Sequence, residues 1–270
     1  MEHHVTSPTA EVRGVPDKTA LRGKLESQLV FGEGFIVEEE KNGWCKGRCK
    51  HDGYAGYVEA AYLSSKPFQA THIVTAARSH VYAEASIKSP LLATLSFGSH
   101  LVILSEAKNP NSVGNIGDSS IASGSLRMTE GFSEVALSPA GKSGYIYSKH
   151  LSPLAVREKD PVATALKFLE TPYCWGGRSG FGIDCSGLVQ VSLARAGIAI
   201  PRDTEDQENT AGKAVNDIQR GDLVYFKGHV GIMTDAKNIL HANAFHMKVC
   251  VEPLQDVEKR GGGITAVRRV

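Results

Sequence analysis

The chain has 270 residues, enough for one large domain or for two to three small ones. Its 30 Lys and Arg residues nearly balance 29 Asp and Glu residues, and the formal net charge of +1 argues against nucleic acid or an anionic membrane as a partner. The five cysteines are odd in number and irregularly spaced, which argues against a secreted scaffold held by disulfides.

The N-terminal residues, MEHHVTSPTAEVRGVPDK, are polar and contain no apolar core of signal-peptide length. No later stretch approaches a membrane span. We therefore interpret residues 1–14 as an N-terminal tail and expect a soluble cytoplasmic protein without a membrane partner. A signal peptide removed beforehand would leave the same pattern, so that alternative stays open.

Two segments of the first 153 residues resemble each other: DGYAGYVEAAYLS (52–64) and AGKSGYIYSKHLS (140–152). Both carry Gly-Tyr followed by an apolar residue, both end in Leu-Ser, and both follow short runs typical of β-strands. The repeat predicts two copies of one small all-β unit, with a polar loop insertion at 109–124 in the second. Similar hairpins within a single domain remain the alternative.

This Gly-Tyr ending resembles that of bacterial SH3-like barrels. The resemblance implies a first barrel over 15–67 and a second over 68–153, with the region of Pro67 and the segment SPLAVREKDP (152–161) as boundaries. The remaining residues, 154–270, form the third predicted domain.

The third domain begins with helical patterns and continues with strands. DPVATALKFLE (160–170) predicts a helix with Asp160 as its cap and with an apolar face that includes Leu169. SGLVQVSLARAGI (186–198) predicts a second helix. The strand patterns that follow are RGDLVYFKG, HVGIMTDAKNILHA and HMKVCVEPL. Helices followed by strands indicate an α+β domain.

Cys185 stands where the second of these helices begins. The partial positive charge of a helix N-terminus and a neighbouring imidazole both favour the thiolate form of a cysteine. His229 and His241 lie on predicted strands on either side of the turn DAKN, so a hairpin would bring them together, one as base and one as orienting group. A structural thiol and half-buried polar histidines remain the alternative.

Three stretches resemble the NlpC family of papain-like cysteine peptidases: TPYCWGGRSGFGIDCSGLV, RGDLVYFKGHVGIM and ILHANA. The resemblance covers about residues 158–255. It implies Cys185 as nucleophile, His229 as base and His241 as orienting residue. It also implies an oxyanion site formed by Tyr173 and the Cys185 amide, with Trp175 and Ser186 in the substrate site. Tyr173 and Trp175 could equally pack against the first helix.

Members of this family with two such barrels resemble γ-D-glutamyl-L-diamino acid endopeptidases, which act on peptides beginning with L-Ala-γ-D-Glu. In the segment PRDTEDQ, the resemblance implies that Asp203 binds the free amine and that Thr204 replaces a common Ser. It also implies that a tyrosine of the first barrel closes the pocket. Tyr54 is our candidate because Lys142 occupies the aligned place in the second copy, and Tyr57 is the alternative.

We expect neither a metal nor a cofactor, because Cys45, Cys49 and His51 fall short of a zinc pattern. The predicted function is hydrolysis of free muropeptides during cell-wall recycling. An amidase or acyltransferase on the same site and a non-enzymatic wall-binding module are the rival functions. The third peptide residue, diaminopimelate or Lys, and the oligomeric state stay open.

Overall fold

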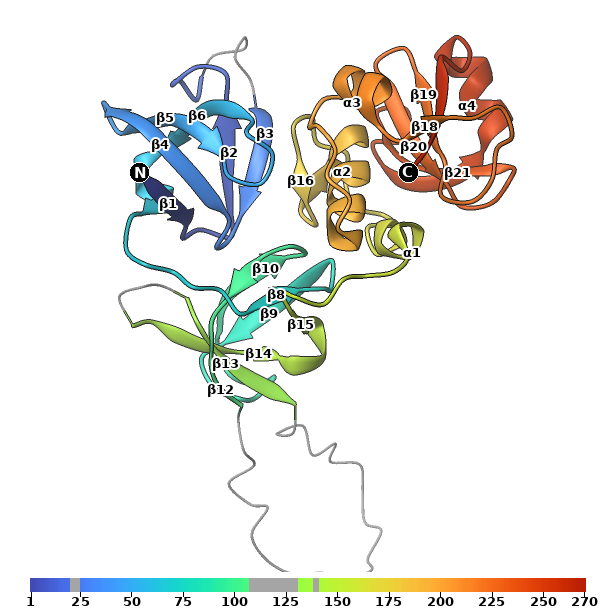
Figure 1. Ribbon diagram of the computed structural model, residues 1–270. Coiled ribbons are helices and arrows are strands. Elements are labelled where there is room, and N and C mark those ends of the chain that lie inside the picture. The colour runs from blue at the N-terminus through green and yellow to red at the C-terminus, as the bar shows by residue number, and fades with distance from the viewer. Residues whose placement is uncertain (20–24, 107–130, 138–140) are drawn as a thin grey trace, which may run out of the picture.

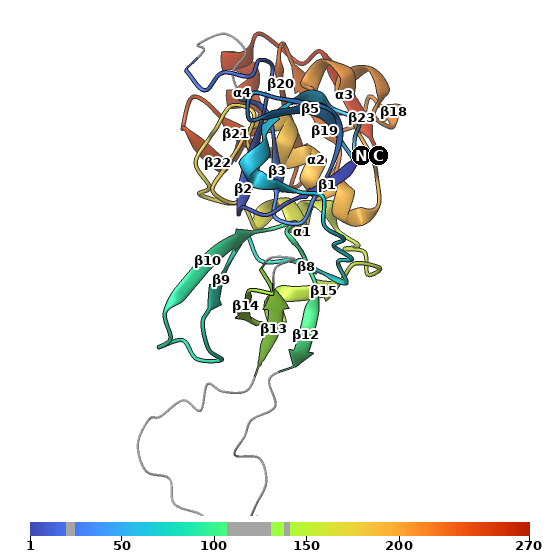
Figure 2. The ribbon, with the colours of Figure 1, turned by 90° about the vertical axis from the view of Figure 1, so that its left-hand side faces the viewer.

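The computed structural model describes residues 1–19, 25–106, 131–137 and 141–270 and consists of three parts (Figure 1). The predicted loop insertion at 109–124 lies outside the described residues. The first two parts are β-structures and the third combines helices with a sheet. Figures 1 and 2 both place the second part below the other two.

The first part is a seven-stranded sheet in the order β3-β2-β6-β5-β4-β1-β7. Its strands are β1 (Glu2–Val5), β2 (Thr9–Arg13), β3 (Leu25–Val30), β4 (Gly34–Lys41), β5 (Trp44–Cys49), β6 (Ala55–Glu59) and β7 (Leu63–Ser64). The prediction of a tail over residues 1–14 is wrong, because this segment supplies β1 and β2. Val5 and Val12 are fully buried in the core of this barrel. The strands were not predicted because these apolar residues alternate with polar ones over only a few positions.

The second part contains a five-stranded sheet, β10-β9-β14-β13-β12, and a three-stranded sheet, β11-β8-β15. Its strands are β8 (His72–Val74), β9 (Arg78–Tyr82), β10 (Leu91–Ser96), β11 (His100–Leu101), β12 (Ile103–Glu106), β13 (Phe132–Ala136), β14 (Ser143–Tyr147) and β15 (Leu151–Pro153). Its core is formed by buried apolar side chains from both sheets.

The repeated Gly-Tyr segments occupy matching positions. In each, a strand (β6 or β14) is followed by a 3₁₀ turn (Ala60–Tyr62 or Ser148–His150) and a short final strand. A Cβ on Gly56 would lie 2.6 Å from Val12, and one on Gly144 would lie 2.7 Å from Val81. Both glycines therefore permit the same close approach of two strands. The domain boundaries at 67 and 153 stay predictions.

The third part has a six-stranded antiparallel sheet in the order β18-β23-β19-β20-β21-β22. The six strands are β18 (Lys213–Ala214), β19 (Leu223–Phe226), β20 (His229–Met233), β21 (Asn238–Asn243), β22 (Lys248–Pro253) and β23 (Ala266–Arg269). Two short strands, β16 (Arg178–Ser179) and β17 (Gly182–Ile183), pair with each other in a separate sheet. Its helices are α1 (Pro161–Leu166), α2 (Cys185–Ala196), α3 (Thr204–Thr210) and α4 (Leu254–Gly261). The helix α2 packs against β20 and β21, with a buried apolar core between them. The α+β fold expected from the sequence is confirmed.

The first helix is shorter than predicted. Asp160 caps α1 as expected, accepting hydrogen bonds from the amides of Val162 and Ala163. The helix ends at Leu166, and Leu169 is 43% exposed rather than turned to the core. Phe168 is buried instead and contacts Phe97 of the second barrel. The 3.6-residue apolar period does not predict this, because the contact is made with another domain.

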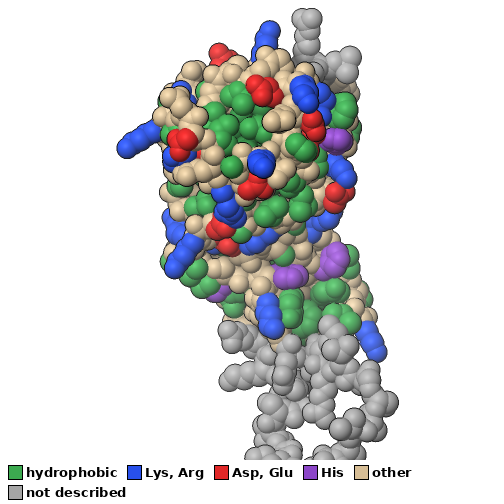
Figure 3. Space-filling view, turned by 90° about the vertical axis from the view of Figure 1, so that its right-hand side faces the viewer, with side chains coloured by type: hydrophobic (Ala, Val, Ile, Leu, Met, Phe, Trp, Pro, Cys, Tyr) green, Lys and Arg blue, Asp and Glu red, His purple; other side chains and the backbone are tan. Residues whose placement is uncertain are grey.

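The surface of the third part carries Lys and Arg side chains interspersed with Asp and Glu side chains (Figure 3). This mixture agrees with the near-zero net charge. Among the described residues, no helix is both long enough and apolar enough to cross a membrane.

Candidate active site

The segment Asp184-Cys185-Ser186-Gly187 builds the N-terminus of α2. Asp184 is the cap: its Oδ1 accepts the Gly187 amide at 2.7 Å and its Oδ2 accepts the Gly176 amide at 2.8 Å. Position 187 needs glycine because a Cβ there would collide with the Gly177 carbonyl. These contacts place Cys185 at the first position of the helix, as the sequence predicts.

Arg202 holds this segment from the other side, and no sequence pattern singled it out. Its guanidinium donates to Asp184 Oδ2 at 2.6 Å, to Ser186 Oγ at 2.8 Å and to Ser27 Oγ of the first barrel at 3.2 Å. Arg202 and Asp184 are both buried, so their ion pair is shielded from water. The Ser186 hydroxyl, expected to meet substrate, therefore serves as an acceptor for Arg202.

The two predicted histidines meet across neighbouring antiparallel strands. His229 begins β20 and His241 lies in β21, with the Nε2 of His229 2.7 Å from the Nδ1 of His241. On its far side, the Nε2 of His241 lies 2.7 Å from Oε1 of Glu252 in β22. The sequence analysis missed Glu252. His241 pairs in register with Cys250, and Glu252 is two residues further along, so strand alternation places it on the same face.

The shorter contact, from His241 Nε2 to Glu252 at 2.7 Å, decides where we place the protons in this chain, although the amide nitrogen of Asn243 also lies 3.1 Å from that Nε2. An ionised carboxylate only accepts hydrogen bonds, so the Nε2 of His241 carries a proton and its Nδ1 is an acceptor. The Nε2 of His229 must therefore be the donor to that Nδ1. This leaves the Nδ1 of His229 as the basic nitrogen of its ring.

The resting charges follow from burial. Burial and then the Asp184 carboxylate raise the pKa of the Cys185 thiol, although hydrogen bonds from Thr204 and the Val230 amide partly oppose them. Burial, followed by repulsion from His241, lowers the pKa of His229 to about 4. Burial opposes ionisation of Glu252, but hydrogen bonds from Arg260 and His241 outweigh it and lower the pKa of that carboxyl. At neutral pH the site thus holds a neutral thiol, a neutral imidazole and a carboxylate.

A cleft of about 280 Å³ opens beside the thiol. Cys185, Tyr173, Trp175 and Thr204 line it, and Thr204 Oγ1 lies 3.8 Å from the Cys185 sulfur. Burial raises the pKa of Tyr173, so its hydroxyl remains a donor. Trp175 is 61% exposed at this cleft and is not part of the core, whereas Tyr173 packs partly against the core.

Asp203 lies in the same cleft and contacts the first barrel. By position it is the N-cap of α3, yet its side chain makes no capping hydrogen bond. Its Oδ2 instead accepts the hydroxyl of Tyr54 at 3.1 Å. Burial raises the pKa of Asp203, against the lowering effects of Tyr54 and Arg202. Tyr57, the alternative to Tyr54, lines a separate cavity on the first barrel.

Side chains of metal-binding type gather at the far end of the histidine chain. His241, Cys250 and Glu252 have ligand atoms within 4.8 Å of one another. The Nε2 of His241 and the Oε1 of Glu252 already form a hydrogen bond with each other. Cys45 and Cys49, by contrast, are buried in the core of the first barrel, and His51 pairs with Asp52 at 3.1 Å.

Comparison with known proteins gives two family matches. Residues 170–259 match the NlpC/P60 family, and residues 18–63 match the bacterial dipeptidyl-peptidase Sh3 domain. A dipeptidyl-peptidase 6 from Lysinibacillus sphaericus is 28% identical over 93% of this chain and 91% of its own length. A γ-D-glutamyl-L-lysine dipeptidyl-peptidase from Bacillus subtilis is 27% identical over 81% of this chain and 72% of its own length.

A solved structure shares the fold of the whole chain. The crystal structure of an NlpC/P60 family protein from Bacillus cereus superimposes with a TM-score of 0.77 at 22% identity, covering 100% of this chain and 99% of that one. The three-part arrangement therefore has a precedent among experimental structures.

Proposed function

Since residues 170–259 match the NlpC/P60 family and residues 18–63 match the bacterial dipeptidyl-peptidase Sh3 domain, we propose that the protein is a γ-D-glutamyl-L-diamino acid endopeptidase. It releases the dipeptide L-Ala-γ-D-Glu from free muropeptides. The observation that carries this proposal is the carboxylate of Asp203, which is held by Tyr54 in the cleft that contains Cys185.

The cleft selects a peptide with a free amine. Asp203, Glu26 and Glu205 line it, so an ammonium group finds acceptors there. A further lining carboxylate, Asp184, is paired with Arg202. Glu26 lines the cleft from the first barrel, and Tyr54 of the same barrel reaches its edge through the hydrogen bond to Asp203. A longer peptide or an intact glycan strand on the N-terminal side of L-Ala would clash with the first barrel.

The reaction is a thiol acyl transfer to water. As the Cys185 sulfur attacks the γ-carbonyl carbon of D-Glu, its proton passes to the Nδ1 of His229. The Cys185 amide and the Tyr173 hydroxyl donate to the oxyanion. The carbon–nitrogen bond then breaks, His229 protonates the amine of the diamino acid, and a thioester remains. Water, deprotonated by His229, hydrolyses the thioester and restores the thiol.

His241 and Glu252 position the base. The hydrogen bond from the Nε2 of His229 to His241 keeps the basic Nδ1 of His229 free. Glu252 fixes the tautomer of His241 and favours the transient positive charge on the two rings. We extend the proposal to a role in recycling wall peptides in the cytoplasm.

Incubation with L-Ala-γ-D-Glu-L-Lys tests the function directly. We expect mass spectrometry to detect L-Ala-γ-D-Glu and Lys with the wild-type protein, and a loss of at least about 10⁴-fold in rate with Cys185→Ala. Cys45→Ala is the matched control, because it removes a thiol from the first barrel core. Comparing the rate on L-Ala-γ-D-Glu-L-Lys with that on the diaminopimelate tripeptide shows which third residue of the substrate is preferred.

An N-acetylated tripeptide tests the specificity. We expect it to be cleaved far more slowly than the free tripeptide, since acetylation removes the ammonium group. Equal rates would refute amine recognition by Asp203. Hydrolysis of another amide bond, or acyl-transfer products, instead of the dipeptide would favour the amidase or acyltransferase alternative. Turnover that survives Cys185→Ala would exclude the cysteine mechanism.

A further inference from the structure

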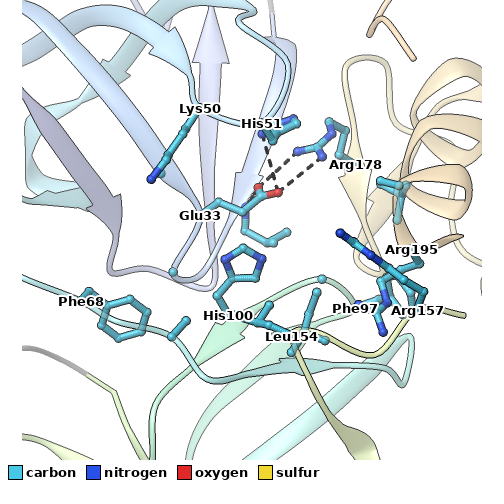
Figure 4. Close-up of a pocket in the computed structure, with 18 of the residues that line it drawn as sticks. Glu33, Lys50, His51, Phe68, Phe97, His100, Leu154, Arg157, Arg178 and Arg195 are labelled. Carbon is cyan, nitrogen blue, oxygen red and sulfur yellow. Dashed lines mark hydrogen bonds and ion pairs between the residues drawn. The ribbon is translucent and has the colours of Figure 1, made fainter. Parts of the chain in front are cut away.

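A second, larger cavity of about 620 Å³ lies where the three parts of the molecule meet (Figure 4). We call it the interdomain cavity. It shares no lining residue with the cleft at Cys185. Its walls come from the first barrel, from the second barrel, and from α2 with the segment that precedes α1. Its volume falls within the range of small-molecule sites, about 300 to 1,000 Å³.

The charges on the first-barrel wall are largely neutralised. Glu33 lies 3.2 Å from the guanidinium of Arg178, and Glu2 lies 2.6 Å from the ammonium of Lys50. Electrostatic attraction to Arg178 and two histidines lowers the pKa of Glu33 despite its burial, so the pair is ionised at neutral pH. This wall therefore contributes little net charge.

The opposite wall carries two arginine side chains, Arg157 and Arg195. Figure 4 shows Arg157 and Arg195 together on the peptidase side, across the cavity from Lys50 and Glu33. Within the described part of the chain, neither guanidinium forms an ion pair with a carboxylate. Glu158 attracts Arg195, but its carboxylate is bonded to Lys167 at 3.0 Å.

The hydrogen-bonding capacity of the Arg195 guanidinium is also only partly used. The residue is 5% exposed, its guanidinium donates to the Val156 carbonyl at 2.9 Å, and its Nε has no hydrogen-bond partner among the described residues. Repulsion from Arg157 adds to the cost of burying this charge. An anion placed beside the two guanidinium groups would offset their mutual repulsion.

Apolar side chains make up part of the remaining lining, beside His51 and His100. Phe97, Leu154, Val191 and Ala194 lie along the walls near the two arginines. We propose that the interdomain cavity binds a small organic anion, a carboxylate or phosphate monoester with an apolar body. Its anionic group lies against Arg157 and Arg195, and its body lies on these apolar side chains.

Isothermal titration calorimetry with the full-length protein tests this site without any substrate turnover, so its outcome is independent of the proposed peptidase activity. The probes are benzoate, phenyl phosphate, inorganic phosphate and benzyl alcohol. We expect benzoate or phenyl phosphate to bind at least about 10-fold more tightly than benzyl alcohol and inorganic phosphate, because only these two combine charge with an apolar body. Comparing the two identifies the preferred anion.

Two variants of exposed residues test the location. Arg157→Ala removes one cation, and we expect about 5-fold weaker binding of the preferred probe. Ala194→Trp fills the cavity from helix α2 and should abolish binding. Arg48→Ala is the matched control, because it removes an exposed guanidinium of the first barrel that does not line the cavity.

Thermal unfolding of each variant confirms that it is folded. Benzyl alcohol bound as tightly as benzoate and phenyl phosphate, or probe binding that is unchanged in both Arg157→Ala and Ala194→Trp, would overturn the proposal. Absence of measurable binding by all four probes would overturn it as well.

Discussion

The two barrels end in the same sequence of strand, 3₁₀ turn and strand, but they contact the peptidase domain through different chemistry. The first barrel uses polar contacts: Asp52 accepts Gln190 at 3.0 Å, and Tyr54 donates to Asp203 at 3.1 Å. The second mainly inserts Phe97, which is 1% exposed and meets Phe168 edge-on, beside a buried hydrogen bond from the Gly180 amide to Ser96 Oγ at 2.8 Å. We therefore propose that the first barrel shapes the cleft at Cys185 and that the second anchors the fold.

The difference predicts separate consequences for stability and for substrate binding. Buried aromatic contacts contribute several kcal/mol each, whereas a hydrogen bond contributes about 1 kcal/mol net. Changes at the second barrel's interface should therefore lower the free energy of unfolding. Changes at Tyr54 and Asp203 should raise KM for an amine-terminated peptide and leave stability nearly unchanged.

The largest effect is expected for Phe97→Ala. The cavity left behind should lower the free energy of unfolding by about 3 to 5 kcal/mol, measured by urea denaturation. Leu92→Ala, on a residue of the same barrel that is 48% exposed, serves as the control. A loss below about 1 kcal/mol would contradict the anchoring role of the second barrel.

Asp203→Asn tests the amine end of the cleft. Removing the carboxylate should raise KM for L-Ala-γ-D-Glu-L-Lys by about 50-fold, since a charged hydrogen bond contributes roughly 2 to 3 kcal/mol. The residual rate on the N-acetylated tripeptide should not change. Asp206→Asn, on an exposed residue of the same helix, is the control. Similar KM values for the two variants would remove Asp203 from the site.

Glu33→Gln distinguishes the polar interface from the apolar one by its pH dependence. Burial opposes ionisation of Glu33, but attraction to Arg178 outweighs it and lowers the pKa of this carboxyl below its ordinary value of 4.5. The stabilisation is therefore complete above pH 4.5 and is lost as the pH falls through the lowered pKa.

We expect Glu33→Gln to cost about 2 kcal/mol at pH 7 and to lose less stability than wild type on acidification, measured by urea denaturation across pH 7 to 3. Glu38→Gln, on an exposed residue of the first barrel, is the control. Parallel pH curves for wild type and Glu33→Gln would show that this ion pair does not support the first-barrel interface.

The smallest effect is expected for Tyr54→Phe. Loss of one hydroxyl that donates to Asp203 should raise KM for the free tripeptide about 5-fold, with kcat nearly constant. Tyr57→Phe should leave KM unchanged, because Tyr57 lines a different cavity. The reverse result would assign the cleft wall to Tyr57.

The sequence by itself determined the features that depend on near neighbours. Asp160 with Pro161 predicts the start of α1, and Asp-Cys-Ser-Gly predicts a helix with Cys185 at its first turn. Two strands around the turn DAKN bring His229 and His241 together. Helix caps, strand alternation and short turns are local, so a single sequence carries them. The strands of residues 1–14 were missed because a polar composition masked a short alternation.

Only the tertiary structure decided which distant charges meet. Glu252 reaches His241 through the register of β21 and β22, and the buried Arg202 finds Asp184 across a loop. Tyr54 meets Asp203 because a separately folded barrel docks on the peptidase domain. Such contacts depend on how whole sheets and domains pack, and the packing is set by many side chains at once. The same packing leaves the cavity between the three parts, which no motif in the sequence marks.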